Sequence, residues 1–120
     1  MFRTSLAIAL VAALGASTSA LAHPKMVAAN PPANGRVTAS PQAIRITFSE
    51  AVFANFSGLV VKDHAGHVMK TGRPTVDPAD KTVLVAPFAR PLAAGVYHVE
   101  WHAVAADTHR VTGQFMFTIG

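Results

Sequence analysis

Residues 97–103 (YHVEWHA) alternate apolar and polar side chains along their whole length. This period of two is typical of a β-strand with one buried face, whereas a helix repeats its apolar positions every three or four residues. Residues 44–48 (IRITF) and 115–119 (FMFTI) show the same alternation, and residues 58–61 and 83–85 are short runs rich in β-branched or aliphatic side chains. The sequence therefore predicts an all-β protein.

The segments between these strands have the composition of turns. Residues 30–35 (NPPANG), 63–66 (DHAG), 77–80 (DPAD) and 91–95 (PLAAG) concentrate the residue types that favour turns, and no segment carries a helical stripe of useful length. Short strands at this spacing predict one Ig-like, Greek-key β-sandwich or barrel of about seven strands, cupredoxin-like in outline.

The first 22 residues have the three parts of a secretory signal. Arg3 gives a positive start, residues 6–14 are apolar, and residues 20–22 (ALA) form a small-x-small cleavage pattern. The apolar run is shorter than the roughly 20 residues that a membrane-spanning helix needs. We expect cleavage after Ala22, export to the periplasm, and a mature domain of residues 23–120 that begins at His23.

Composition narrows the class of protein further. The chain has no cysteine, so packing alone must hold the fold in an oxidising compartment. The formal net charge is +4, but the basic residues are scattered along the sequence, whereas a nucleic-acid site needs a concentrated basic face. We therefore expect no nucleic-acid partner, and we expect a monomer.

A chain that begins at His23 would carry a metal chelate at its first residue. The free amine and the imidazole Nδ1 of His23 can close a six-membered ring on one ion. Pro24 has no backbone N–H, and residue three of the mature chain is Lys25. These two residues exclude the copper motif that needs histidine at position three and deprotonated backbone amides before it.

Asp107 and His109 are the best candidates for the remaining ligands. In an extended stretch, residues two apart project to the same side, so the carboxylate and the imidazole can converge on one ion. One amine, two imidazoles and one carboxylate form an N₃O set that suits tetragonal Cu(II). Zinc is the rival metal, because it accepts the same ligand types in a tetrahedral arrangement.

The mature sequence resembles the CopC family of periplasmic copper-resistance proteins along essentially its whole length. Four segments carry the resemblance: residues 23–35 (HPKM, then NPPANG), 46–50 (ITFSE), 91–97 (PLAAGVY) and 101–109 (WHAVAADTH) with Gly113. The resemblance implies a Greek-key β fold that binds one Cu(II) ion per mature chain through His23, Asp107 and His109. It places Glu50 near the copper, where we expect hydrogen bonding to a ligand rather than direct ligation.

One departure from the family concerns its second, methionine-rich Cu(I) segment. The corresponding residues 60–72 hold only Met69, alongside His64 and His67. One thioether is too few for such a site, so the sequence indicates the Cu(II)-only type. His64 and His67 flank a glycine turn, and we interpret them as a solvated hairpin tip. The sequence does not decide whether they form a second metal site with Met69. His98 and His102 are read as surface residues.

The function predicted from the sequence is that of a copper carrier or buffer in copper homeostasis or resistance, and not that of an enzyme. The resemblance implies a CopD-like inner-membrane transporter as a partner. An alternative is a copper oxidase related to the lytic polysaccharide monooxygenases, which share the amine-plus-imidazole chelate; here, however, Asp107 would occupy the position that oxygen needs. A metal-free interaction module is a further alternative, because β-sandwiches host many functions.

Overall fold

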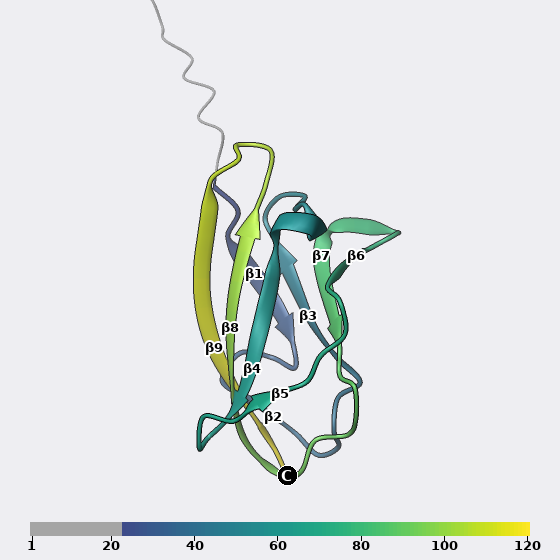
Figure 1. Ribbon diagram of the computed structural model, residues 1–120, viewed down its shortest axis with the longest axis vertical. Coiled ribbons are helices and arrows are strands. Elements are labelled where there is room, and N and C mark those ends of the chain that lie inside the picture. Colours follow the sequence, from purple (N-terminus) through teal and green to yellow (C-terminus); the bar gives the residue numbers. More distant parts are fainter. Residues whose placement is uncertain (1–22) are drawn as a thin grey trace, which may run out of the picture.

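Two β-sheets pack face to face in the computed structural model, which describes residues 23–120 (Figure 1). The expected signal segment, residues 1–22, lies outside the described residues. One sheet has four strands in the order β1 (Met26–Asn30), β3 (Ala43–Phe48), β7 (Asp80–Pro87) and β6 (Thr75–Asp77). The other has five, in the order β2 (Gly35–Val37), β9 (Arg110–Ile119), β8 (Gly95–Val104), β4 (Gly58–Asp63) and β5 (Val68–Met69). A single 3₁₀ turn, η1 (Ala54–Phe56), is the one helical element of residues 23–120.

Strand pairing is antiparallel throughout the described residues except between β2 and β9, which run parallel. The chain crosses from the four-stranded to the five-stranded sheet three times, after β1, after β3 and after β7. Such crossings are typical of Greek-key sandwiches. The predicted fold class is confirmed, with nine strands in residues 23–120 where about seven were expected.

The core lies between the two sheets and is formed by the apolar positions of the alternating strands. Along β8 the buried residues are Tyr97, Val99, Trp101 and Ala103, while the side chains between them are exposed or half-buried. β3 and β9 contribute in the same way: Ile44, Ile46, Phe48, Phe115, Phe117 and Ile119 are all buried. Burial of one face of each strand explains why these three strands could be read from their period of two.

Trp101 packs closely on the backbone of the neighbouring strand. Its indole meets Phe48 edge to face, with the ring centroids 5.1 Å apart, and is 7% exposed. Gly113 is its partner in the β8–β9 register, and a Cβ at this position would overlap the indole. Glycine therefore leaves the space that the tryptophan fills.

The outermost strands of both sheets are short. β1 has five residues, β2 and β6 have three each, and β5 has two. The pairing of β1 and that of β6 are both interrupted by a shift of register. Among residues 23–120, the structure contains no helical segment with the length and hydrophobicity that a membrane span requires.

Candidate metal centre

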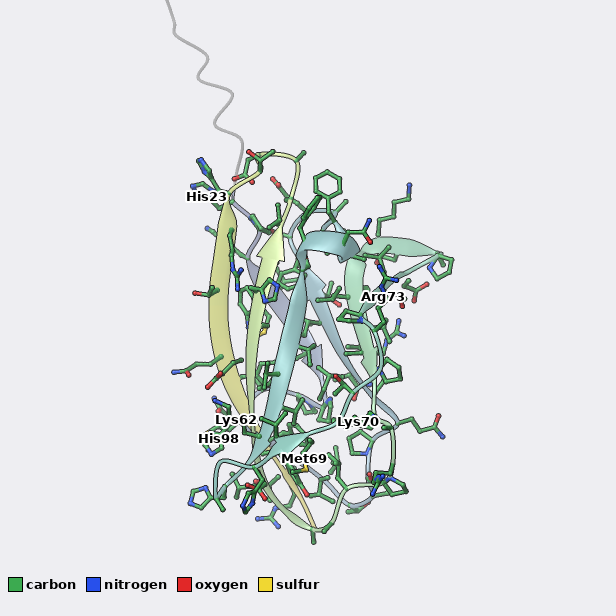
Figure 2. The ribbon with its side chains drawn as sticks, viewed as in Figure 1. His23, Lys62, Met69, Lys70, Arg73 and His98 are labelled. Atoms are coloured by element: carbon green, nitrogen blue, oxygen red, sulfur yellow. The ribbon has the colours of Figure 1, made fainter. Side chains whose placement is uncertain are left out.

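The segment before β1 brings His23 to one end of the sandwich (Figure 2). Pro24 is fully buried, so it anchors the segment in the domain. Lys25 is held against the residue that follows β3: its backbone N–H donates to Ser49 Oγ at 2.9 Å, and the backbone N–H of Ser49 donates to Lys25 O at 2.8 Å. These contacts leave His23 exposed but at a defined place.

The other candidate ligands come from the loop that joins β8 to β9. The backbone of Val104, where the loop begins, receives a hydrogen bond from the N–H of Phe53 at 2.8 Å and donates one to the buried Ser57 Oγ at 3.0 Å. The N–H of Thr108 donates to Ala105 O at 2.9 Å and closes a tight turn. The loop is therefore fixed at its base and across its middle.

Thr108 adopts a left-handed backbone conformation, with φ of 63°. This region is unfavourable for a β-branched residue: such a conformation costs about 1–3 kcal/mol and persists only where the surrounding structure imposes it. The prediction that Asp107 and His109 lie on one side of an extended stretch is therefore wrong. A turn directs the two side chains toward one another instead.

His23, Asp107 and His109 form a cluster in which one ligand atom from each residue lies within 4.8 Å of the others. His23 Nδ1 lies 2.6 Å from Asp107 Oδ2, and His109 Nδ1 lies 3.8 Å from the same oxygen. The two imidazole centroids are 5.2 Å apart. The three candidate ligands, two of them 84 residues apart in the sequence, thus converge on one small volume.

Burial divides the cluster into a sheltered acid and two accessible imidazoles. The side chain of Asp107 is 4% exposed, against 58% for His23 and 71% for His109. A buried carboxylate needs partners for its oxygens. It receives one hydrogen bond from the backbone N–H of His109 at 3.2 Å, and its other oxygen faces His23. A cation that arrives from solvent would meet the imidazoles first and the carboxylate behind them.

Glu50, the residue expected to support a ligand, does not belong to this cluster. It is half-buried directly after Ser49, and its expected hydrogen bond to a ligand stays a prediction. The contact of Ser49 with Lys25 was not predicted from the sequence, although Ser49 lies in the family-like segment 46–50. Pairing of residues 26–30 with β3 would have suggested it, because that register brings Lys25 beside Ser49.

The remaining polar candidates lie elsewhere on the five-stranded sheet. His98 and His102 are half-buried on its outer face, in agreement with the predicted polar face of their strand. Burial lowers the pKa of His102, and the nearby Arg110 lowers it further, so the imidazole is neutral at ordinary pH. Met69 packs against the core, which leaves it poorly placed as a soft metal ligand.

The fold and the cluster together place this chain in a class of small β proteins. Its members are Greek-key sandwiches that carry a candidate metal centre, here two histidines and one carboxylate, at one end. The CopC domain family matches residues 26–120. The chain belongs to the CopC family.

Three comparisons describe this relationship. The copper resistance protein C of Pseudomonas syringae pv. tomato is 37% identical over 123 residues, covering 98% of this chain and 96% of that protein. The crystal structure of PcoC, a methionine-rich copper resistance protein from Escherichia coli, superposes with a TM-score of 0.75 at 34% identity, over 82% of this chain and 100% of that one. The copper transport protein CutJ of Bacillus subtilis is 28% identical over 85% of this chain, a match that covers 19% of CutJ.

Proposed function

We propose that the mature protein binds one Cu(II) ion in the periplasm and acts as a copper carrier or buffer in copper homeostasis or resistance. The ligands are the amine and imidazole of His23, the carboxylate of Asp107 and the imidazole of His109. The observation that carries this proposal is the convergence of these three side chains within 4.8 Å. Two of the relatives described above are named as copper resistance proteins, which supports the choice of metal.

Cu(II) is favoured over Cu(I) by the chemistry of the donors. Nitrogen and oxygen ligands suit the oxidised ion, whereas Cu(I) prefers sulfur. PcoC is described as methionine-rich, while this chain has four methionines, of which Met69 packs against the core. Copper binding should weaken as the pH falls, because the imidazole and amine nitrogens must be deprotonated to bind the ion.

A role in binding and transfer is favoured over catalysis. Asp107 faces both imidazoles, so its carboxylate would take up a coordination position that an oxidase would leave open for oxygen. The exposure of both histidines would allow a partner to exchange ligands with the bound ion. In CutJ the matching segment is a small part of a protein named for copper transport, which supports a CopD-like membrane transporter as the partner.

The decisive experiment tests the first residue of the mature chain. Mass spectrometry of the exported protein should find His23 at its N-terminus. One extra residue before His23 blocks the amine, and we expect it to lower Cu(II) affinity by more than the roughly 10- to 100-fold that loss of a supporting outer-shell group costs. Electron paramagnetic resonance should lose the tetragonal, nitrogen-ligated spectrum.

His67→Ala is the matched control for this experiment. It removes an imidazole that is more exposed than that of His23 and contacts Asp63 at a different place in the fold, so copper affinity should not change. Equal Cu(II) affinity in the extended and the mature protein would refute the proposed ligand set, because that set requires the free amine.

A further inference from the structure

A second pair of imidazoles belongs to His98, on the five-stranded sheet, and His64, in the turn after β4. His98 lies toward the opposite end of the sandwich from His23 (Figure 2). His98 projects from β8, beside Lys62 of β4 and Met116 of β9 in the strand register. His64 follows directly after β4 and stacks on His98, with the ring centroids 5.7 Å apart and the planes inclined by 22°. The candidate metal centre uses neither residue.

The distance between the facing nitrogens suits a shared tetrahedral cation. His64 Nδ1 and His98 Nε2 are 3.4 Å apart, which is long for a hydrogen bond. Zinc binds imidazole nitrogen at about 2.0–2.1 Å, and a tetrahedral angle then separates two such nitrogens by about 3.3 Å. A square-planar Cu(II) ion would need adjacent nitrogens only about 2.8 Å apart at similar bond lengths.

The turn that carries His64 is fixed by hydrogen bonds of its own backbone. The N–H of Gly66 donates to Asp63 O at 3.0 Å, and the N–H of Asp63 donates to His67 O at 2.9 Å. His98 is fixed by its place in a central strand. A cation would therefore meet two imidazoles that are already close together, which lowers the entropic cost of gathering its ligands.

The neighbouring charges leave this pair accessible to a cation. The ammonium of Lys62 lies 3.2 Å from the carboxylate of Glu100, which offsets its positive charge. His67, in the same turn, is directed to Asp63: its ring Nδ1 lies 3.0 Å from one carboxylate oxygen, and its backbone N–H donates to the other at 2.8 Å. His67 is therefore a neighbour of the pair and not a part of it.

From this geometry we infer that His64 and His98 bind a zinc-class divalent cation in tetrahedral coordination, with water in the remaining positions. This site is independent of the copper proposal, because its donors lie on β8 and in the β4–β5 turn. It also differs from a methionine-rich Cu(I) segment, since both protein donors are imidazoles. The ion would be held at the surface, where exchange with solvent is rapid.

The test is a titration with Zn(II) and Co(II) in the exported protein that carries His23→Ala, Asp107→Ala and His109→Ala, so that the first centre loses all three of its side-chain ligands. We expect one zinc per chain and the intense visible absorption of tetrahedral Co(II). His64→Ala or His98→Asn should each lower zinc affinity by at least the roughly 10- to 100-fold seen when outer-shell partners are lost. His67→Ala should leave the zinc affinity unchanged.

Three results would overturn this inference: zinc affinity that survives His64→Ala, an equal loss of affinity in His67→Ala, or a weak octahedral Co(II) spectrum. Circular dichroism separates a loss of ligand from a loss of fold in the His98→Asn variant. His64 lies in an exposed turn, so His64→Ala tests the same pair without altering a strand.

Discussion

Ser49 should control copper affinity without touching copper. Its hydroxyl accepts a hydrogen bond of 2.9 Å from the backbone N–H of Lys25, two residues after the proposed ligand His23. Ser49→Ala removes that hydroxyl and leaves the second backbone contact in place. A hydrogen bond of this kind contributes about 0.5–1 kcal/mol at an exposed site. If the contact holds His23 in place for binding, Cu(II) affinity should fall about two- to fivefold.

Competition titration against a chelator of known copper affinity measures this change, with Ser40→Ala as the matched control. Ser40 Oγ accepts a hydrogen bond of 2.8 Å from the backbone N–H of Leu92, so the control removes a similar contact outside the candidate centre. Ser40→Ala should lower the free energy of unfolding and leave copper affinity unchanged. Equal copper affinity in Ser49→Ala and the unmodified protein would refute the positioning role.

Two further predictions concern the sandwich itself. Gly113→Ala should lower the free energy of unfolding by about 1–3 kcal/mol, because the new Cβ would overlap the Trp101 indole. Urea unfolding measures this loss. The control is Gln114→Ala, at an exposed position on the same strand, which should change the free energy of unfolding by less than about 0.5 kcal/mol. The backbone N–H of Ala79 and the guanidinium of Arg45 hold the pKa of Asp77 below its ordinary value of 3.8. The ionised carboxylate therefore stabilises the fold above that pH, and this stabilisation is lost as the pH falls through the lowered pKa. Thermal unfolding at neutral pH and below about pH 4 should show Asp77→Asn less stable at neutral pH and less sensitive to acid, and an unchanged acid response would contradict the assignment.

The long strands could be predicted from the sequence because one face of each is buried. β3 and β8 show this directly, since their apolar positions are the core positions. β9 begins at Arg110, five residues before the predicted start at Phe115. Its first half does not alternate in hydrophobicity and is a strand because it pairs with β8, which a local pattern cannot reveal. β5, with two residues, is too short to show any period.

The residues of the candidate centre could be predicted from the sequence, but the contacts that hold them in place could not. His23, Asp107 and His109 were nominated by ligand chemistry, and the structure brings their side chains together. The turn at Thr108 and the contact between Lys25 and Ser49 depend on tertiary register and on backbone conformation. Neither leaves a periodic signal in the sequence, so both had to be found in the structure.

The short outer strands described above also have a consequence for how copies of this chain meet. Each sheet ends in a strand of two to five residues, and the five-residue β1 is interrupted by an irregular register. Each edge therefore presents few consecutive unpaired N–H and C=O groups to another copy of the chain. Intermolecular pairing of edge strands would be limited to a few hydrogen bonds. The chain has no cysteines and so no disulfide to stabilise it. The short outer strands therefore protect it against aggregation without any change to the buried residues.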